Sequence, residues 1–499
     1  MSVPDIHRDR NNYYHPESEA DIITLVNYAR ANAYQVRVRG SGHSMPQATF
    51  TDPCVIDEVD VSAAAPEANV NMVLDRYNEI LSLDVTTKRV TVQSGIHLGR
   101  DPENPTSTLE NSLLHQLHVE GLALESLGGI SHQTVAGFLC TGSAGGSLTF
   151  NAQDNVQALR FVDGKGEIVE VSRSDDNLDD FNASLVSLGL LGVISTVTFE
   201  CVHDFNICGS QIGTLTDDSS VDLFSDCPEE PRIGVTNFLK AAEYARIIWW
   251  PQGESRTQIW QAKQISPTSD FEPIPFAVFP NPEIMMLYSY LMTVLGNIQD
   301  MAEVRSIGES KEQRFKMVMT EYLTKEYELP NWKAEGIANL LNKGNDIVLK
   351  IVTGLIDTVC PIKRALFLPL VTNTAIALLN EVGKEEKFQD YGYAGLPMDN
   401  SSDDVIVPVM WSEMWIPLSQ ATKATSALRD YFSKIIGDGT VLKKTGNNCI
   451  ELYATKSSNA WLSMSYSSGD DEWSEGAFRV DPYWFVHNKG DFRELFGPM

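Results

Sequence analysis

The chain has 499 residues, of which 43% are hydrophobic and 21% charged, and this composition is ordinary for a folded globular protein. Its 38 basic and 67 acidic side chains leave a formal net charge of −29. That charge argues against nucleic acid or an anionic membrane surface as a partner, and it disfavours a highly charged anionic substrate. A chain of this length is expected to form roughly two or three domains, with a core that needs no disulfide staples.

The seven cysteines predict neither a disulfide framework nor a zinc site, because their number is odd and no two are spaced as Cys-x-x-Cys. A reducing compartment is therefore the default. Residues 1–9 carry acidic side chains and no apolar core segment, so we expect neither a signal peptide nor a transit peptide. Together these features predict a cytoplasmic protein.

The first 202 residues mix helical and strand patterns. Residues 16–33 predict an amphipathic helix with acidic side chains in its first turn, where they suit the helix dipole. Alternating Val and Arg at 36–39 predict a half-buried strand directly after it. Further strands are expected at 54–59, 89–93, 156–162, 168–171 and 189–199, and further helices at 107–119 and 179–188. This mixture indicates an α+β domain that ends near Val202.

The rest of the chain predicts a second α+β domain. Residues 245–251 and 257–263 predict a tryptophan-rich antiparallel strand pair. Residues 283–382 are helical by pattern, and their longest charge-free piece falls short of the roughly 20 residues that span a bilayer. Buried cap helices are therefore expected, and a monotopic membrane contact is the disfavoured alternative. Further strands are expected at 404–417, 448–453 and 460–466, and a helix at 419–436.

Two glycine-rich segments carry the clearest chemical signal. The strand at 36–39 runs into the turn Arg39-Gly-Ser-Gly-His-Ser44. Glycines permit positive φ, and successive backbone N–H groups in such a turn can converge on an anion such as a pyrophosphate. Small and hydroxyl residues also crowd the segment between Leu127 and Ser147, which can pack closely on a flat ligand. The two segments are far apart in sequence, so a shared site requires that they meet in space.

Together these segments resemble the two flavin-embracing loops of the vanillyl-alcohol oxidase family, and within it the sugar-1,4-lactone oxidases and alditol oxidases. The resemblance covers most of the chain and thins between residues 281 and 404. It implies a two-domain α+β flavoprotein with an FAD-binding domain over residues 1–202 and a substrate or cap domain, with an antiparallel sheet and helices, over residues 203–499. In this group the histidine of the Gly-x-Gly-His-Ser turn is bonded covalently to FAD, and His43 is the matching residue.

The resemblance implies a set of cofactor-binding residues and no metal site. They are Arg39, Gly40, Ser41, Gly42, His43, Ser44, Gly129, Ser131, Thr134, Gly137, Thr141, Gly142, Ser143, Gly145, Gly192 and Val193. A bond from His43 would fix the flavin ring and raise its reduction potential. The alternative for His43 is a non-covalent hydrogen bond near the ring. The glycine at 192 also fits a buried strand that packs closely on its neighbours.

Three residues are expected on the substrate side. Glu451 matches the acid of the family's Glu-x-Arg strand, and Glu413 resembles a second acid on a neighbouring strand. Either acid could instead be a solvated strand residue. Tyr453 stands where the family has its arginine. Lys489 is the third residue, although His487-Asn-Lys489 is one residue shorter than the family's closing His-Trp-x-Lys.

The resemblance implies oxidation of a CH–OH group of an aldonolactone or polyol by hydride transfer to flavin N5. Oxygen is the expected acceptor and gives hydrogen peroxide, because Gly128 and Gly129 leave room at the flavin. One alternative is a flavoenzyme of the same fold for a larger apolar alcohol or natural-product intermediate, suggested by nine tryptophans and the apolar region 337–380. Another is a flavin-binding scaffold that has lost catalysis, suggested by the missing lysine motif and by Ala144, which replaces a family histidine.

Overall fold

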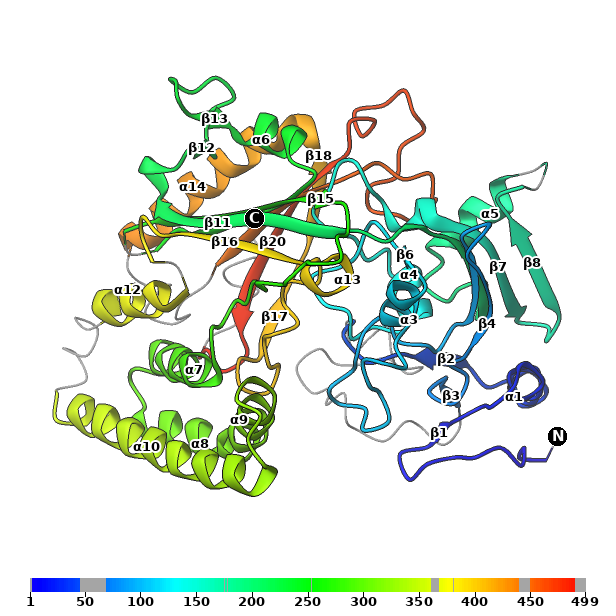
Figure 1. The fold of residues 1–499 in the computed structure, drawn as a ribbon, viewed down its shortest axis with the longest axis horizontal. Helices are drawn as coiled ribbons and strands as arrows, with labels where there is room; N and C mark the ends of the chain where they lie inside the picture. The colour runs from blue at the N-terminus through cyan, green and yellow to red at the C-terminus, as the bar shows by residue number, and fades with distance from the viewer. Residues whose placement is uncertain are drawn as a thin grey trace.

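The computed structural model describes residues 2–44, 69–174, 176, 178–252, 254–359, 368–379, 381–438 and 449–489. Figure 1 shows two blocks side by side, with the amino-terminal elements on the right and a long twisted sheet with its helices on the left. The predicted boundary near Val202 falls within the short strand β10 (Val202–His203).

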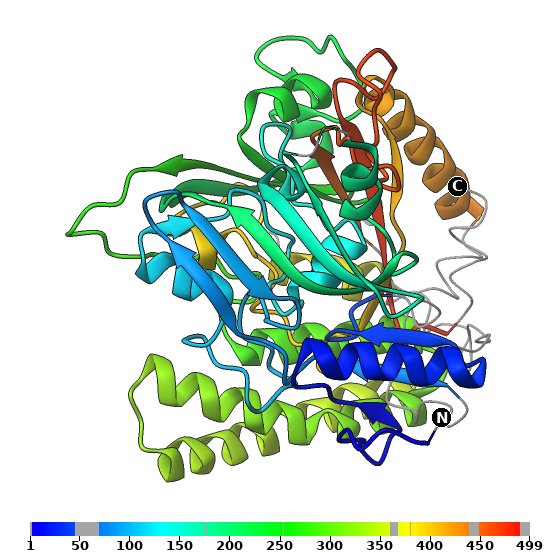
Figure 2. The same cartoon turned by 90° about the vertical axis from the view of Figure 1, so that its right-hand side faces the viewer.

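A small parallel sheet carries the first glycine-rich turn. Its strands lie in the order β1 (Tyr13–Tyr14), β3 (Val70–Val73) and β2 (Val36–Arg39). Helix α1 (Glu19–Asn32) begins at Ser18, whose side chain accepts a hydrogen bond from the third residue of the helix in a capping box. The buried face of α1 packs on this sheet, and Figure 2 shows the helix lying beside the strands. The turn that follows β2 is thereby held at the carboxyl end of its strand.

A five-stranded antiparallel sheet forms the rest of the first block within the described residues. Its order is β4 (Ile80–Asp84), β5 (Arg89–Gln93), β9 (Gly192–Glu200), β7 (Val156–Asp163) and β8 (Ile168–Ser172). The helices α3 (Leu113–Val119), α4 (Val135–Cys140) and α5 (Leu178–Leu185) accompany it. The predicted strands at 89–93, 156–162 and 168–171 are confirmed, and the last two, β7 and β8, form an antiparallel pair. One apolar core joins this sheet to α3, α4 and α5.

An eight-stranded antiparallel sheet organises the second block among the residues described. Its order is β16 (Glu385–Tyr391), β11 (Asn206–Leu215), β15 (Arg256–Ile265), β14 (Tyr244–Trp250), β19 (Ile450–Thr455), β20 (Ala477–Phe485) and β17 (Val409–Trp411), with β18 (Met414–Pro417) also paired to β20. The predicted pairing of the tryptophan-rich strands is confirmed in β14 and β15. The single strand expected at 404–417 is instead the two short strands β17 and β18.

The two faces of this sheet differ in chemistry because side chains alternate along a strand. One face presents apolar residues such as Ile247, Leu452 and Val480 to α6 (Val235–Ala241) and α14 (Ala421–Asp438). The opposite face of the same central strands carries the buried charged and phenolic side chains of Arg246, Glu451, Tyr453, Arg479 and Asp481, together with the partly buried Tyr483. A buried polar face of this kind is uncommon in a sheet that serves stability alone.

A helical block lies below the sheet in Figure 1. It consists of α7 (Pro282–Gly296), α8 (Met301–Ser310), α9 (Glu312–Glu326), α10 (Asn331–Asp357) and α12 (Leu368–Leu379). These helices have their own apolar core, and α12 reaches the polar sheet face, where Ile376 packs with Ile248 and Trp250. Within the described ranges, none of the helices has the length and apolar character that crossing a membrane requires.

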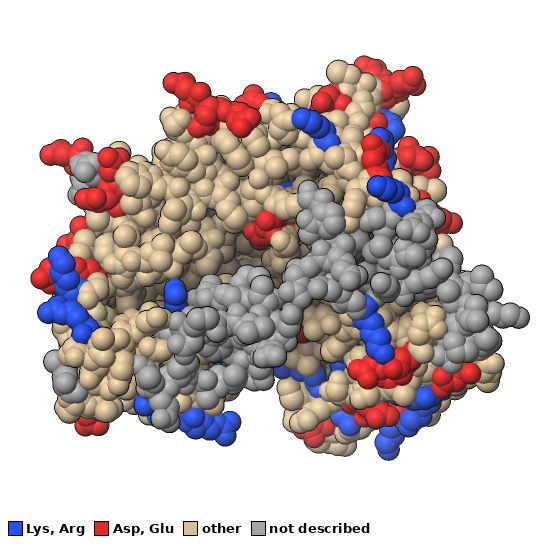
Figure 3. All heavy atoms as spheres, turned by 180° about the vertical axis from the view of Figure 1, so that it is seen from behind, with Lys and Arg blue, Asp and Glu red and all other residues tan. Residues whose placement is uncertain are grey.

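Smaller elements complete the described chain. They are β6 (Leu122–Ala123), which pairs with β10, the parallel pair β12 (Val221–Asp222) and β13 (Ile233–Gly234), and α13 (Gly392–Gly395). On the face shown in Figure 3, charged side chains lie mainly along the outline of the molecule, and the basic ones are scattered.

Two further sequence expectations are wrong, and local side-chain hydrogen bonds explain both. The helix expected at 107–119 begins only at Leu113, because Thr108 and Asn111 bond each other's backbone in a turn before it. The strand expected at 460–466 is a series of turns in which serine side chains bond nearby backbone N–H groups. The partner of β19 is therefore β20. The strand expected at 54–59 lies outside the described residues.

Candidate functional site

The turn after β2 meets the second glycine-rich segment, as the sequence predicts. The Ser41 hydroxyl donates a hydrogen bond of 2.6 Å to the His132 carbonyl oxygen. Gly40 lies so close to Thr134 that a Cβ at position 40 would stand 2.7 Å from the Thr134 hydroxyl oxygen. Gly42 has φ +86°, a conformation that favours glycine. The turn therefore depends on both glycines, one for close approach and one for its backbone angle.

Hydroxyl groups shape the second segment around α4. The Thr134 side chain caps this helix by accepting from the Gly137 N–H, and the Thr141 hydroxyl donates to the Gly137 carbonyl at 2.9 Å. The Ser143 hydroxyl lies 3.2 Å from that of Thr141 and accepts from Gln133 Nε2 at 3.1 Å. These bonds fix the start of the loop at residues 141–147, which we call the cofactor loop.

A cavity of about 1180 Å³ lies between the two segments. Nine of the predicted cofactor-binding residues line it: Arg39, Gly40, Ser41, Ser44, Thr134, Gly137, Thr141, Gly192 and Val193. The volume exceeds the roughly 300–1,000 Å³ of sites for drug-sized ligands, which suits a dinucleotide. Its wall combines glycines, hydroxyls and the carboxyl end of β2. This wall fits FAD, because a pyrophosphate needs N–H donors and close backbone approach.

His43 lies in the turn between Ser41 and Ser44, two residues that line the cavity, and its own side chain remains partly accessible. Its side chain is 21% exposed, and its Nδ1 lies 4.0 Å from a carboxylate oxygen of Asp404. Its ring centroid is 5.7 Å from that of His132. Burial, with a smaller contribution from His43, lowers the pKa of His132 to about 4, so that ring is neutral at pH 7. The His43 ring is thus close to the cavity without being locked in a strong ion pair.

The cofactor loop is bonded directly to the second block. Three successive carbonyl groups of the loop each accept a hydrogen bond from a different strand of the large sheet. The pairs are Ala144 with Arg479 Nη1 at 2.8 Å, Gly145 with Thr455 Oγ1 at 3.3 Å, and Gly146 with the Ala245 N–H at 2.8 Å. A Cβ at Gly146 would overlap the Ala245 carbonyl oxygen. The polar sheet face therefore begins where the cofactor loop ends.

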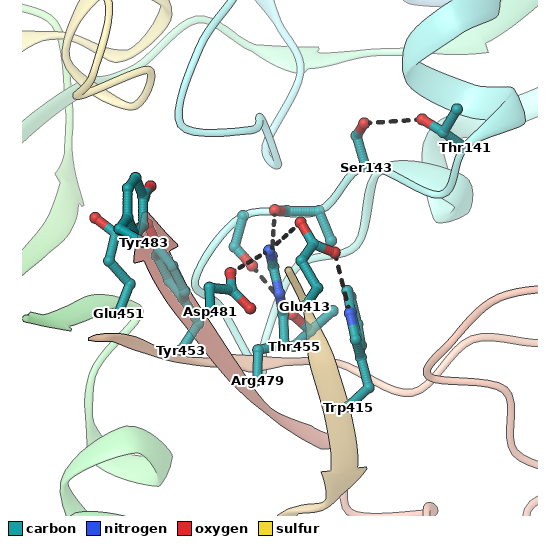
Figure 4. Close-up of polar contacts among 12 residues, drawn as sticks. Thr141, Ser143, Glu413, Trp415, Glu451, Tyr453, Thr455, Arg479, Asp481 and Tyr483 are labelled. Carbon is teal, nitrogen blue, oxygen red and sulfur yellow. Dashed lines mark hydrogen bonds and ion pairs between the residues drawn. The ribbon is translucent and has the colours of Figure 1, made fainter. Parts of the chain in front are cut away.

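The polar face holds two groups of charged residues, each centred on an arginine, and Figure 4 shows the second of them, around Arg479. In the first, Nη1 of the fully buried Arg246 lies 2.6 Å from Asp399 Oδ1 and 3.4 Å from Glu451 Oε1. The hydroxyls of Tyr453 and Tyr483 donate to Glu451 Oε2 at 2.6 and 2.9 Å. Glu451 is thus surrounded by donors on both of its oxygens.

In the second group, Arg479 pairs with two acids. Its Nη2 lies 2.7 Å from Asp481 Oδ2 and 3.0 Å from Glu413 Oε1. The guanidinium stands between two aromatic rings, with its carbon 4.6 Å from the Trp415 centroid and 5.0 Å from that of Tyr453. The Trp415 indole also donates to Glu413. These contacts hold the guanidinium in one place and orientation.

Burial raises the pKa of both Glu451 and Asp481, although Arg246 and Arg479 act in the opposite direction. Several buried polar atoms of the two groups have no hydrogen-bond partner among the described residues: Arg246 Nε and Nη2, Arg479 Nε and Asp481 Oδ1. Such atoms are costly to leave unpaired in a folded protein. A polar ligand with several oxygens could satisfy them.

The predicted substrate-side residues do not all meet. Glu451 and Glu413 both lie on the polar face, one in each group. Lys489 lies beyond the end of β20, where its half-exposed ammonium pairs with Asp300 at 2.8 Å. The structure therefore does not bring Lys489 to the two acids.

Besides Gly145, two further predicted cofactor residues contact the second block. Ser131 exchanges hydrogen bonds with the Asn400 side chain, and the Gly129 carbonyl accepts from the Asp399 N–H. These bonds place this part of the loop beside Arg246 and its partners. Gly129 also needs its lack of a side chain here, because a Cβ would come 2.6 Å from Asp399 Oδ2.

Four charged residues at the face were not expected from the sequence: Arg246, Asp399, Arg479 and Asp481. The run Arg479-Val-Asp-Pro-Tyr483 has polar side chains at every second position, the pattern of a strand with one polar face. This pattern could have identified the two residues on β20. Arg246 stands alone in an apolar strand, and Asp399 lies in a turn, so neither has a comparable signal.

Comparison with known proteins supports the assignment of the first block. Residues 11–172 match the family model for an FAD binding domain. The chain is 30% identical over 250 residues to L-gulonolactone oxidase of Mus musculus, covering 50% of this chain and 48% of the relative. It is 31% identical over 204 residues to D-arabinono-1,4-lactone oxidase of Eremothecium gossypii, covering 40% and 33%. The matched part is thus less than half the length of each relative.

Solved structures match over nearly the whole chain at low identity. Cholesterol oxidase from Brevibacterium sterolicum aligns with a TM-score of 0.59 and 13% identity, covering 98% of this chain and 79% of that one. This likeness confirms the expected fold, a two-domain α+β flavoprotein, and carries no information on substrate.

Proposed function

We propose that this chain, whose amino-terminal block is an FAD-binding domain of the vanillyl-alcohol oxidase type, oxidises a CH–OH group of an aldonolactone or polyol. Oxygen takes up the electrons and gives hydrogen peroxide. The observation that supports this most is that the buried polar sheet face adjoins the cofactor loop through Arg479, Thr455 and Ala245. A substrate bound to that face lies beside the cofactor.

In this proposal residues 1–202 hold FAD and residues 203–499 hold the substrate. The turn from Arg39 to Ser44 binds the pyrophosphate with its backbone N–H groups, and His43 forms the covalent tether. When bound, FAD accepts a hydride equivalent at N5. The cavity wall of glycines and hydroxyls described above supports this arrangement.

The polar face binds the hydroxyl groups of the substrate. Arg246 and Arg479 offer N–H donors that no described residue uses, and Glu451 and Glu413 anchor the two arginines. Apolar contacts between α12 and the strand residue Trp250 close one end of the face, which helps to exclude water. A lactone or polyol matches this mixture of donors and acceptors better than a charged substrate does.

The first experiment is the visible spectrum of the purified protein before and after acid precipitation. Yellow colour that stays in the pellet supports a covalent flavin, and His43→Ala should then move the colour to the supernatant. His203→Ala, at an exposed histidine on β10, is the matched control and should leave the colour in the pellet. A colourless protein that does not take up added FAD would contradict the proposal.

The second experiment identifies the substrate class. Anaerobic mixing with D-arabinono-1,4-lactone, L-gulono-1,4-lactone or a polyol should bleach the flavin, and admission of air should restore the colour with formation of peroxide. Bleaching that air does not reverse would leave an FAD-dependent dehydrogenase. Absence of bleaching with every carbinol would favour a flavin-binding scaffold that has lost catalysis.

A larger apolar alcohol is the second candidate substrate. The observation that favours it is the apolar wall of Ile248, Trp250 and Ile376 at the edge of the polar face. Aromatic and alicyclic alcohols in the same anaerobic assay would then bleach the flavin faster than lactones do. We also propose a cytoplasmic location, on the evidence of the cysteine pattern alone, and cell fractionation tests it.

A further inference from the structure

Two buried carboxyl groups face each other across the central strand pair of the polar face. Glu451 on β19 and Asp481 on β20 are direct partners in the antiparallel register. Side chains of directly opposed residues lie on the same face of a sheet, about 5 Å apart at their Cβ atoms. Both residues are therefore placed to meet one ligand, with exposed fractions of only 4% and 3%.

The hydrogen bonds of the two acids are unequal. Glu451 Oε2 accepts from both Tyr453 and Tyr483, and Oε1 faces Arg246. Asp481 Oδ2 accepts from Arg479, whereas its Oδ1 has no hydrogen-bond partner among the described residues and is inaccessible to solvent. Glu451 is thus committed to protein donors on both oxygens, and Asp481 keeps one oxygen for a ligand.

Asp481 is also close to the cofactor loop. The same Arg479 guanidinium that bonds Asp481 Oδ2 donates from its other terminal nitrogen to the Ala144 carbonyl. One side chain therefore separates this carboxyl group from the loop, and Figure 4 shows Asp481 and Arg479 together beneath it. Trp415 and Tyr453 hold the guanidinium between their rings, which fixes the carboxylate that it binds.

We propose that Asp481 is a catalytic residue of the oxidation, an inference that rests on the proposed function. Its Oδ1 accepts a hydrogen bond from the substrate hydroxyl and takes the proton when the O–H bond breaks. On the carbon that bears this hydroxyl the C–H bond breaks, and its hydrogen and electron pair pass to FAD. The carbon–oxygen double bond forms at that carbon. The electrons leave to oxygen, the acceptor named above. Arg479 and Glu451 are positioning residues: Arg479 holds Asp481, and Glu451 holds Arg246 and does not take this proton.

Burial raises the pKa of both acids, so the division of roles rests on their hydrogen bonds and not on their pKa shifts. A general base works best when its pKa lies near the operating pH. Burial raises the pKa of Asp481 well above the usual range for an aspartate, against the opposing effect of Arg479. The groups facing it are Arg479 and Glu413 from the second group and Glu451 across the strand pair.

Asp481→Asn and Glu451→Gln are the two informative variants, each compared with the wild-type holoprotein. Stopped-flow mixing with D-arabinono-1,4-lactone without oxygen separates binding, seen as an early flavin absorbance change, from reduction, seen as bleaching. We expect Asp481→Asn to bind the lactone with an affinity within about threefold of the wild type and to reduce the flavin about 10²–10⁴-fold more slowly. The acid limb of the pH profile, which is the fall in reduction rate at low pH, should be lost in this variant. Glu451→Gln should weaken lactone binding and should keep the acid limb of the pH profile.

A readout without turnover accompanies this test. In the wild type, lactone binding in the early phase should weaken by about threefold at most as the pH falls, because protonated Asp481 is neutral like the amide of Asp481→Asn. In Asp481→Asn, lactone binding should not depend on pH. Asp481→Glu keeps a carboxylate and should recover part of the reduction rate. This recovery would show that the slow reduction in Asp481→Asn comes from the lost carboxylate and not from poor packing. Flavin content and thermal midpoint identify misfolding.

The proposal is overturned if Asp481→Asn, with normal flavin content, is reduced at a third of the wild-type rate or faster and keeps the acid limb. It is also overturned if Glu451→Gln removes the limb and Asp481→Asn does not. A wild-type protein that no carbinol reduces would instead overturn the proposed function. The two failures are therefore distinguishable.

Discussion

Arg479 and Tyr453 face each other across β20 and β19, with the guanidinium carbon 5.0 Å from the centre of the phenol ring. The family pattern Glu-x-Arg predicts an arginine at position 453. In this chain position 453 is a tyrosine, and the cation is Arg479 from the neighbouring strand, which lies over the Tyr453 ring. The guanidinium that lies over Tyr453 is therefore supplied by the neighbouring strand.

This relationship predicts that a second arginine is harmful unless the first is removed. Tyr453→Arg should lower the free energy of unfolding, because it removes a hydrogen bond to Glu451 and sets two buried cations side by side. Tyr453→Arg with Arg479→Met should recover at least about 1 kcal/mol of that loss in a double-mutant cycle. Denaturant unfolding of the four proteins measures the coupling, and strictly additive effects would show that the two positions are independent.

The cofactor loop should not tolerate a side chain where it touches the sheet. Gly146→Ala forces a methyl group into the Ala245 carbonyl and should cost about 1–3 kcal/mol of stability as well as flavin content. Gly344→Ala, on the exposed side of α10, is the matched control, because nothing lies within 4 Å of the added carbon and its backbone angle is ordinary. The ratio of flavin to protein absorbance in the two variants tests the claim, and equal ratios would contradict it.

His132 should make stability depend on pH in acid. Its pKa is about 4 in the fold and about 6.5 when unfolded, so the unfolded chain binds the proton more readily between these values. The stabilisation is complete above pH 6.5 and is lost as the pH falls towards 4, by up to about 3 kcal/mol.

His132→Gln should therefore flatten the stability profile between pH 6.5 and 4. His487 is held at a similar pKa of about 4, mainly by burial, and contributes a slope that remains in this variant. Urea unfolding at several pH values gives the comparison. A variant with the wild-type slope would mean that His132 is not held neutral in the fold.

The capping box of α1 should contribute measurably to the block that holds the cofactor turn. Ser18→Ala removes the side-chain acceptor for the Asp21 N–H and should destabilise the helix by about 1 kcal/mol. Ser18→Asp keeps an acceptor and should be close to neutral. Hydrogen exchange of the first-turn amides of α1 reports the difference, and equal protection in both variants would argue against the cap.

Features that depend on residues close together in the chain could be predicted from the sequence. The glycines and hydroxyls of the Arg39–Ser44 turn and the helix before it are local signals, and the cavity lies where they indicated. Strand pairs joined by short turns, such as β14 and β15, also depend on local alternation.

The charged face could not be predicted in the same way. Arg246, Asp399 and Arg479 come together only through the register of β14, β19 and β20, whose partners are distant in sequence. The Glu-x-Arg motif pointed to Glu451 but not to Asp481. Asp481 is its direct partner on the neighbouring strand, and its Oδ1 has no hydrogen-bond partner among the described residues. Lys489 is the opposite case. Its sequence motif suggested a place beside the substrate, but its side chain forms a surface ion pair with Asp300.

The bonds between the cofactor loop and the large sheet have a consequence for biosynthesis. The loop at 144–146 leaves the ribosome early, but the groups that bond its carbonyls belong to residues 245, 455 and 479. A partly translated chain therefore lacks the wall that fixes the loop, even when all its own flavin-contacting residues have been made. We expect stable capture of FAD only after β20 has been translated and has docked, which makes cofactor loading a late step in the life of each molecule.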